Sequence, residues 1–511
     1  MKELREFWKQ LESGTDIRGV AVAGIAGQPM NLTSDVVSKA AQGYVEWLHR
    51  KAGVSMADMK IAVGHDSRIS APRLREAVLA GISKMGATVL DCGLSTTPSM
   101  FLTTVDLGCT GAIEITASHH PYHRNGLKFF TRAGGLDHDD IREILGYAQE
   151  LYELQQADVP GLVVPVRYLD TYSRRLREMI CSQVQGEEYD KPLKGFHIVV
   201  DAGNGAGGFY AHEVLEPLGA DVSGSQFLEP DGHFPNHVPN PEDPQAMQAV
   251  CEAVIRHKAD FGVIFDTDVD RAGAVGADGT PINRNRLLAL ASAIVLAEEP
   301  GATVVTDSIT SDGLKTYLEQ TLGGVHHRFK RGYKNVINEA VRLNESGINC
   351  PLAMETSGHA AMRENYFLDD GAYLITKLII QMARLHQEGK TLESLLAPLA
   401  EPKETLELRL PILSQQFRET GEQVLQQLEA CAKERGWQIA PDNREGLRVS
   451  FEPGCGDGWF LLRLSVHDPI LPLNVESNGE GGVRQILQEL APFLEDCQGI
   501  QADCVREFLG A

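Results

Sequence analysis

Three stretches of the chain repeat one plan, and this repeat constrains the fold more than any other feature. Each stretch has an apolar run, a turn that carries an aspartate, a helical segment, a glycine and a second apolar run. The stretches begin at Ile61, His197 and Thr303, with helical parts over 74–85, 210–218 and 314–322. Glycine commonly ends helices, and strand–helix–strand units build sheets covered by helices. Because the copies lie more than a hundred residues apart, we predict three similar α/β domains and not a solenoid.

The C-terminal region follows a different pattern. Alternating side chains over 406–410 indicate a half-buried strand, and a helical stretch covers 415–435. Further strands are expected over 447–451 and 459–464, followed by a helix over 483–494. Strands followed by a helix favour a separate α+β domain.

Length and linker composition divide the chain. A sequence of 511 residues is long enough for about three to four domains. Segments near 158–161 and 400–403 contain proline and are typical of linkers. We therefore predict three α/β domains with mixed sheets and a C-terminal α+β domain. Their predicted bounds are 1–163, 164–283, 284–401 and 402–511.

The acidic composition limits the partners. The chain has 47 lysines and arginines against 70 aspartates and glutamates, a formal net charge of -23. This sign argues against nucleic acids and anionic membranes, which bind basic surfaces. It does not exclude an anionic substrate, because acids that bind a cation no longer repel an anion. Screening also confines the remaining field to about 8 Å at physiological salt.

Other segments bear on the compartment. Residues 1–6 mix charges and lack the apolar core of a secretory signal. The apolar stretch over 287–297 is too short to span a bilayer. The nine cysteines are scattered and none forms C-x-x-C, which is typical of reduced thiols. We expect a cytoplasmic protein.

Three aspartates, Asp266, Asp268 and Asp270, follow the apolar run 261–265. In an extended chain, carboxylates at alternate positions can point to one side, where their oxygens suit Mg²⁺ or Ca²⁺. An EF-hand is improbable, because Arg271 stands where that loop needs glycine. A phosphatase with Asp266 as the nucleophile remains an alternative, as does an acidic surface turn. We favour a metal, because the three charges repel one another without a cation.

A second segment, 116–121, places Ser118 beside His119 and His120, with Lys128 nearby. A serine next to bases can act as a nucleophile. A polar loop after a strand is the structural alternative. The combination of this segment with a separate triple-aspartate site supplies the groups needed for metal-assisted phosphoryl transfer.

Three further motifs are weaker. Residues 203–208 fit G-x-G-x-x-G, with Glu229 placed for a ribose contact, but a tight turn needs glycines anyway. Residues 355–359 alternate donors and acceptors that suit sugar hydroxyls, or form a polar turn. Arg463, in the segment 463–469, can bind phosphate, or lies on a surface strand.

Five segments in order resemble motifs of the α-D-phosphohexomutases, the phosphoglucomutase/phosphomannomutase superfamily. They are similar to its D-I-R-G segment and to its phosphoserine, metal, sugar and phosphate loops. Each match is modestly specific, whereas five in order over essentially the whole chain are strongly so. The segments are 15–19, 116–121, 266–271, 355–359 and 463–469.

The resemblance implies the fold and the reaction. The three α/β domains and the α+β domain would surround a central cleft. The enzyme would be an isomerase, an intramolecular phosphotransferase that interconverts hexose 1-phosphate and hexose 6-phosphate, of glucose or mannose. It would act through a phosphoserine and a hexose 1,6-bisphosphate, which also serves as the primer. The cofactor would be Mg²⁺.

The resemblance also implies residue roles. Ser118 would be the phosphoserine. Lys128 and His119 would act as acid or base, and Arg18 would lie near the phosphoserine. The metal would be held by the phosphate on Ser118 and by Asp266, Asp268 and Asp270. The substrate would be held by Arg271, Tyr333, Lys334, Glu355, Ser357, His359, Arg463, Ser465 and His467.

Several residues depart from the family pattern and leave the sugar preference open. His120 replaces the usual asparagine, and Ser308 stands where some bacterial phosphomannomutases have a lysine. The other departures are Thr267, Val269, His467 and Asp468. A phosphoglucosamine mutase and a catalytically silent phosphosugar-binding protein are therefore alternatives. The expected partner is a phosphosugar, and the chain would be a monomer or homodimer.

Overall fold

The computed structural model describes residues 3–150, 157–184, 188–465 and 468–510. These residues form two compact units, and each is described by itself. Unit 1 contains Met1–Leu287 and Ser357–Ser394, and unit 2 contains Leu288–Thr356 and Leu395–Ala511.

The first sheet of unit 1 comes from the first repeated stretch and its surroundings. Its strands are β1 (Glu12–Ser13), β2 (Asp16–Val20), β3 (Lys60–His65), β4 (Thr88–Leu94), β5 (Gly111–Ile115), β6 (Arg124–Thr131), β7 (Gly134–Gly135) and β8 (Val163–Pro165). They are ordered β1-β2-β6-β5-β3-β4-β8, with β7 paired to β6. The sheet is mixed: β3 is parallel to β4 and β5, whereas β6 is antiparallel to β5. β8 includes residue 163, where the sequence places the first domain boundary.

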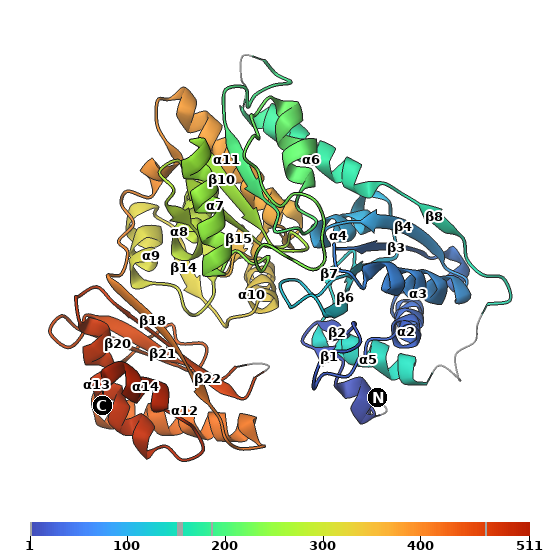
Figure 1. The fold of residues 1–511 in the computed structure, drawn as a ribbon. Helices are drawn as coiled ribbons and strands as arrows, with labels where there is room; N and C mark the ends of the chain where they lie inside the picture. The colour runs from blue at the N-terminus through green and yellow to red at the C-terminus, as the bar shows by residue number, and fades with distance from the viewer. Residues whose placement is uncertain (1–2, 151–156, 185–187, 466–467, 511) are drawn as a thin grey trace. The chain divides into compact units, whose positions relative to one another are not determined.

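Helices cover both faces of this sheet (Figure 1). The helices of this part are α1 (Glu6–Lys9), α2 (Ser34–Ala52), α3 (Ala71–Lys84), α4 (Thr97–Asp106), α5 (His138–Gln149) and α6 (Tyr168–Val184). Ile61 and Val63 of β3 belong to one core with α2, α3 and α5. On the opposite face Phe130 packs against Phe101 of α4, with ring centroids 6.3 Å apart. Burial on both faces explains the continuous apolar runs in the sequence.

The second sheet of unit 1 carries the triple-aspartate loop. Its strands are β9 (Ile198–Asp201), β10 (Phe261–Phe265), β11 (Ala272–Gly276) and β12 (Pro281–Ile282), and α7 (Pro244–His257), α11 (Gly371–Gln387) and the pair β16 (Ala360–Met362) and β17 (Leu368–Asp369) complete this part. β10 is parallel to β9 and antiparallel to β11. α7 shares a core with Val199, Ile264 and Val275. On the other face Phe265 packs against Tyr210, whose hydroxyl hydrogen-bonds Thr376 of α11.

The second repeated stretch departs from its predicted form. The helix expected over 210–218 is a π-helical segment, Tyr210–Leu215, followed by a 3-10 turn, Glu216–Leu218. Pro217 has no backbone N–H and cannot continue α-helical hydrogen bonding. The carbonyl of Glu213, four residues earlier, accepts instead from the Arg177 guanidinium. The second apolar run of this stretch, over 219–222, was expected to form a strand, and this expectation is wrong: Asp221 forms only an isolated bridge with His197.

Unit 2 contains an α/β part and an antiparallel part. In the first, β13 (Thr303–Thr306) lies parallel to and between β14 (Val325–Arg328) and β15 (Leu352–Met354). The accompanying helices are α8 (Arg284–Glu298), which begins in unit 1, α9 (Asp312–Thr316), the π-helical segment Tyr317–Thr321 and α10 (Tyr333–Glu345).

The C-terminal sheet of unit 2 is ordered β18-β22-β21-β20-β19 and is antiparallel throughout. Its elements are β18 (Glu404–Pro411), α12 (Phe417–Glu434), β19 (Gln438–Ile439), β20 (Leu447–Phe451), β21 (Gly458–Leu462), β22 (Ile470–Ser477), α13 (Gly482–Asp496) and α14 (Asp503–Leu509). The three helices lie along one face (Figure 1). Trp459 and Leu461 point to the other face and pack against Ile309 of the α/β part. The predicted α+β region is confirmed.

Two absences concern the described residues. None of their helices has both the length and the apolar character needed to cross a bilayer. All nine cysteines are free thiols, as their scattered spacing predicts.

Candidate active site

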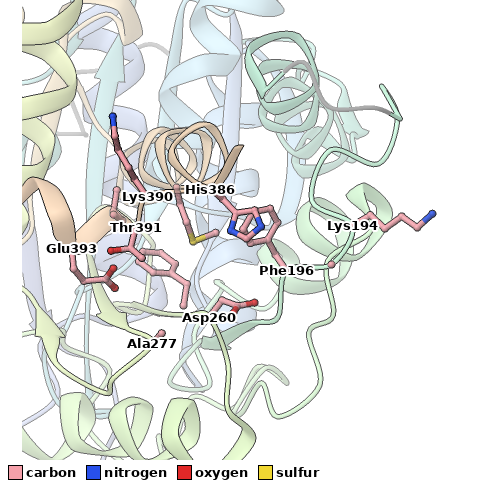
Figure 2. Close-up of a pocket in the computed structure, with 12 residues that line it drawn as sticks. Lys194, Phe196, Asp260, Ala277, His386, Lys390, Thr391 and Glu393 are labelled. Carbon is pink, nitrogen blue, oxygen red and sulfur yellow. The ribbon is translucent and has the colours of Figure 1, made fainter. Parts of the chain in front are cut away.

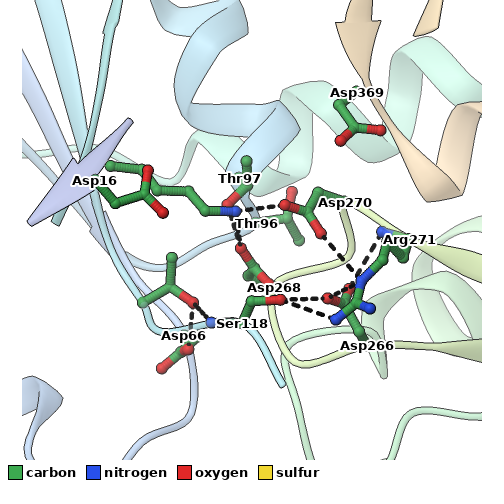
Figure 3. Close-up of polar contacts among 12 residues, drawn as sticks. Asp16, Asp66, Thr96, Thr97, Ser118, Asp266, Asp268, Asp270, Arg271 and Asp369 are labelled. Carbon is green, nitrogen blue, oxygen red and sulfur yellow. Dashed lines mark hydrogen bonds and ion pairs between the residues drawn. The ribbon is translucent and has the colours of Figure 1, made fainter. Parts of the chain in front are cut away.

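Ser118 lies just after β5, in a buried loop of unit 1. Its backbone is left-handed, with φ of 49°. Such a conformation is uncommon for a residue other than glycine and is held only by surrounding contacts. The Ser118 hydroxyl donates to Asp266 Oδ2 at 2.9 Å and accepts from Arg271 Nη2 at 3.0 Å (Figure 3). The structure therefore brings the predicted nucleophile and the triple-aspartate loop together.

Arg68 holds the Ser118 loop in place. Its Nη1 donates to the carbonyls of Pro121 and Arg124, and its Nη2 donates to those of Ser118 and His120. Asp66 accepts from Arg68 Nε at 3.2 Å, and both side chains are fully buried. Sequence analysis missed this pair. The signal was present in the Asp-Ser-Arg turn after β3, because β3 and β5 are parallel and end at the same sheet edge.

We expect Arg68→Lys to lower turnover by roughly 100-fold while preserving the charge. A lysine has one ammonium group and cannot reproduce the planar, five-donor fork, so the loop carbonyls would lose their fixed partners. A small misplacement of a reacting group costs about this factor. The turnover measured by steady-state kinetics and the melting temperature should both fall. Arg75→Lys is the matched control, because Arg75 of α3 is half-buried and forms an ion pair with Asp91 of β4. Unchanged turnover in Arg68→Lys would contradict the assignment.

The aspartates of the loop between β10 and β11 form a compact cluster. Carboxylate oxygens of Asp266, Asp268 and Asp270 all lie within 4.8 Å of one another, and all three residues are buried. Asp268 Oδ1 and Asp270 Oδ1 accept no hydrogen bond from any described residue. Buried oxygens without a partner are costly, and hard oxygen donors match a divalent cation such as Mg²⁺. The cluster therefore fits a metal ion.

Two side chains from the first sheet reach the same cluster. Lys128 Nζ lies 2.9 Å from Asp268 Oδ2 and also contacts Asp270 Oδ2. Thr97, at the start of α4, donates its hydroxyl to Asp268 Oδ2 at 2.5 Å. Thr97 was missed by sequence analysis, because nothing in its surroundings distinguishes it from an ordinary helix start. These contacts connect the two sheets of unit 1 at the site.

The charges in this cluster shift the pKa values of Asp266 and Asp270 in opposite directions. Burial, with Asp270 and Asp268 nearby, raises the pKa of Asp266 well above its usual range. Burial opposes ionisation of Asp270 too, but Lys128, His359 and Arg271 outweigh it and lower the pKa of Asp270. Burial and the Arg271 guanidinium lower the pKa of His119, so its ring is neutral. Neutral His119 accepts from Arg271 Nη2 at its Nδ1, 2.5 Å away.

His359 reaches the cluster from the segment that returns to unit 1. It contacts Asp369 closely, lies 4.0 Å from Asp270, and bridges to Arg271 through the backbone. Burial acts to lower the pKa of His359, but Asp369 and Asp270 outweigh it and raise the value to about 9. The imidazolium therefore adds a positive charge beside the acidic loop.

Arg18 lies on β2, the strand next to β6. Its Nη2 donates to Asp16 Oδ2 at 2.7 Å. After burial, the charge of Arg18 is among the influences that lower the pKa of both His119 and His120. Its positive charge thus acts on His119 and His120 of the Ser118 loop.

Glu114 is a buried acid behind the site that sequence analysis did not single out. It stands opposite Lys128 in the β5–β6 register, and neither carboxylate oxygen has a hydrogen-bond partner among the described residues. Burial, with Asp66 and Asp268 nearby, raises the pKa of Glu114 well above its usual range. The fold therefore opposes ionisation of Glu114.

We expect Glu114→Met to stabilise the protein by about 1–3 kcal/mol at neutral pH, since it removes buried oxygens without partners. The unfolded chain loses this proton above the ordinary glutamate pKa, whereas the raised pKa of Glu114 lets the folded chain keep it to a higher pH. The ionisation part of the cost of Glu114 is therefore absent in acid and grows as pH rises, whereas the cost of burying its polar oxygens is present at every pH. Denaturation midpoints at pH 5 and pH 8 test this. Glu114→Gln should remove the pH dependence but keep part of the burial cost. An equal Glu114→Met gain at both pH values would contradict a retained proton.

The predicted sugar and phosphate residues lie mainly in unit 2. Glu355 accepts from the backbone N–H of Gly332 at 2.6 Å, just before Tyr333 and Lys334 begin α10. Arg463 follows β21 and forms an ion pair with Glu445. The remaining predictions are divided: Ser357 belongs to unit 1, Ser465 to unit 2, and His467 lies outside the described residues.

The glycine-rich segment packs against backbone. A Cβ on Gly205 would lie 2.7 Å from the carbonyl oxygen of Thr267, and one on Gly208 would lie 2.2 Å from that of Leu228. Asp201 accepts from Gly203 and pairs with buried His237. These contacts support the tight-turn interpretation, in which the glycines let this segment approach the triple-aspartate loop.

A separate pocket of about 220 Å³ lies elsewhere in unit 1 (Figure 2). Phe196 and His386 meet edge to face, with ring centroids 5.1 Å apart. Lys390 and Glu393 are also in its wall, so the lining mixes both charges with apolar groups. The pocket contains none of the residues that the sequence predicts for the site.

Family models match three successive parts of the chain. They describe the α/β/α domains I, II and III of phosphoglucomutase/phosphomannomutase and match residues 10–154, 170–279 and 283–402. The chain belongs to the phosphoglucomutase/phosphomannomutase family. Similar members include a phosphoglucomutase of Neisseria gonorrhoeae, 31% identical over 85% of this chain and 88% of that one. A phosphomannomutase/phosphoglucomutase of Pseudomonas putida is 30% identical over 86% and 89% of the two chains.

A solved structure of a phosphoglucomutase/phosphomannomutase family protein from Burkholderia thailandensis has the same fold. It is 26% identical, covers 96% of this chain and 98% of its own, and has a TM-score of 0.78. The family membership predicted from five motifs is confirmed. The predicted fold class, three α/β parts with mixed sheets and a fourth α+β part, is also confirmed for this family member. The roles of single residues stay predictions.

Proposed function

We propose that this protein is a phosphohexomutase that interconverts the 1-phosphate and 6-phosphate of glucose, mannose or both. The observation that carries the proposal is the buried contact of the Ser118 hydroxyl with Asp266 and Arg271, beside two further aspartates. Family membership supports the same reaction class.

Ser118 is the proposed carrier of the phosphoryl group. In the first half-reaction its P–O bond breaks, a new P–O bond forms to a sugar hydroxyl, and the hydroxyl proton leaves to a base. The bisphosphate then reorients, and its other phosphate returns to Ser118. Lys128 and His119 serve the reacting hydroxyl as acid or base. Arg18 and Arg271 stabilise charge on the group in transit.

Asp266, Asp268 and Asp270 are the proposed ligands of Mg²⁺, together with the phosphate on Ser118. Bound there, the ion would neutralise charge on the transferring phosphoryl group. The residues around it exclude water, since Ser118 and the three aspartates are all buried. Exclusion of water protects a phosphoserine from hydrolysis.

The predicted substrate residues of unit 2 recognise the part of the substrate that does not react. Glu355 binds sugar hydroxyls with Tyr333 and Lys334, and Arg463 binds the phosphate that is not transferred. Arginine suits this task because its planar fork matches phosphate. The remaining proposed substrate residues are Arg271, Ser357, His359, Ser465 and His467.

The proposed domain organisation for this function is four domains, which cover residues 1–163, 164–283, 284–401 and 402–511. The family-model matches, which change domain near 154–170 and 279–283, support the first two divisions. The proposed partner is a phosphosugar, with hexose 1,6-bisphosphate as primer, for a cytoplasmic monomer or homodimer.

A mutase assay tests the function. Purified protein is incubated with Mg²⁺, a priming hexose 1,6-bisphosphate, and separately with glucose 1-phosphate, mannose 1-phosphate or glucosamine 6-phosphate. Isomerisation of a glucose or mannose phosphate supports the proposal. Turnover of the amino sugar alone would identify a phosphoglucosamine mutase. Absence of turnover with all three would leave a silent phosphosugar-binding protein.

A further inference from the structure

Glu445 of unit 2 is presented by a firmly held loop between β19 and β20. Within this loop, Asp442 Oδ2 pairs with Arg328 Nη1 at 2.9 Å. Asn443 donates to the Gly446 carbonyl at 3.0 Å and accepts from the Arg448 N–H at 2.9 Å. These contacts hold the loop on both sides of Glu445, so displacement of its carboxylate requires movement of the side chain and not of the loop.

Three donors converge on the Glu445 carboxylate. The Ser308 hydroxyl donates to Oε2 at 2.6 Å, and the Arg331 backbone N–H donates to the same oxygen at 3.1 Å. Arg463 Nη1 lies 3.9 Å from Oε1. A hydroxyl, a backbone N–H and a guanidinium are the groups that proteins use to bind phosphate. Here they surround an internal carboxylate instead.

Arg463 depends on this carboxylate. The Arg463 and Glu445 side chains are each only 12% exposed. Burial lowers the pKa of Arg463, and Glu445 is the largest influence that opposes this shift. Arg463 Nε is buried and has no hydrogen-bond partner among the described residues. The guanidinium thus has a donor left over that a larger anion would satisfy.

The backbone next to Glu445 sits against Arg463. Gly446 has φ of 54°, and a Cβ there would lie 2.1 Å from the Leu462 carbonyl oxygen and 2.7 Å from Arg463 Cα. Only glycine fits at this close approach. The pocket beside Ser308 and Glu445 has a volume of about 10 Å³, which holds at most about one water molecule. A phosphate group does not fit there while Glu445 keeps its position.

We propose that Glu445 is an internal anion that occupies the phosphate-binding position of unit 2 until a substrate phosphate displaces it. Glu445 therefore sets the affinity for the phosphate that is not transferred. Its charge keeps Arg463 compensated when no substrate is bound, and its displacement gives the substrate phosphate three ready donors. The assignment of Arg463 to phosphate rests on the proposed function.

Binding measurements test this proposal on the full chain. Isothermal titration with orthophosphate and with glucose 1-phosphate compares wild type with Glu445→Gln, which keeps the shape and one acceptor oxygen. We expect the variant to bind both ligands roughly tenfold more tightly, because substitution removes a competing charged contact. Its KM for the mutase substrate should fall by a similar factor. Glu452→Gln, at an exposed position in the turn between β20 and β21, is the control and should change neither value.

Equal or weaker phosphate binding by Glu445→Gln would overturn the proposal and make Glu445 a residue that only positions Arg463. Circular dichroism confirms folding, and Glu445→Ala gives a second folded variant with the same expected direction. The two proposals fail separately. If wild type isomerises none of the three sugars but the Glu445 variants bind orthophosphate more tightly, the proposed function falls and this inference stands.

Discussion

Ser118→Ala is expected to lower mutase turnover by roughly 10⁴-fold or more and to abolish incorporation of phosphate into the protein. The alanine has no oxygen to carry the phosphoryl group, and loss of a nucleophile commonly costs at least this factor. Substrate binding should change far less, because the Arg463 region is intact. Steady-state kinetics gives the turnover, and peptide mass analysis after incubation with glucose 1,6-bisphosphate locates the phosphate.

The matched control is Ser182→Ala, an exposed serine on α6 whose hydroxyl only donates to the Met179 carbonyl. It should keep full activity. Full turnover in Ser118→Ala would show that the nucleophile is another residue. A phosphate recovered on the Asp266 peptide, with Ser118 unlabelled, would favour the aspartyl-phosphate chemistry that the triple-aspartate segment alone also allows.

Removal of the metal, or of one of its proposed ligands, has the second large effect. We expect Asp268→Asn or treatment with a chelator to lower turnover by roughly 10³-fold, because the transferring phosphoryl group would lose its largest positive charge. Readdition of Mg²⁺ should restore the chelated wild type but not the variant. In wild type, Mg²⁺ should also raise the melting temperature, since a ligand that binds only the folded state stabilises it.

Asp278→Asn removes the same charge from an exposed turn between β11 and β12 and is the control for this experiment. It should keep both activity and the Mg²⁺-dependent shift in melting temperature. A chelated enzyme with undiminished turnover would contradict a metal at the cluster. An Asp268→Asn protein that retains the Mg²⁺ shift would place the ion elsewhere.

The sequence predicted the local segments of the site better than the contacts between these segments. Asp266–Arg271 and the Ser118 loop follow β10 and β5 as their apolar runs indicate. The contacts of Lys128 with Asp268 and Asp270 span about 140 residues, and no periodicity encodes which sheet edges face each other. The resemblance of the five ordered motifs to those of the family indicated that these segments meet, whereas the spacing of residues along the chain did not.

What escaped prediction has physical causes. Arg68 acts through backbone carbonyls, so the Asp-Ser-Arg turn that contains it does not reveal which loop it holds. Glu445 is an ordinary acid in a loop until the fold places Ser308 and Arg463 beside it. Pro217 was visible in the sequence, but the Arg177 contact that accommodates it was not. Each of these depends on the position of a second residue far along the chain.

The late return of Ser357–Ser394 to unit 1 has a consequence for synthesis of the protein. α11 lies in this segment, and it covers the face of β10 and β11 that includes Phe265. On the ribosome, at about 5–20 residues per second, several seconds pass between synthesis of this face and synthesis of the α11 helix that covers it. During this interval nascent chains present an apolar sheet surface to one another. A polypeptide that stops at Leu287 would keep that surface permanently, and chaperone demand should therefore peak before α11 emerges.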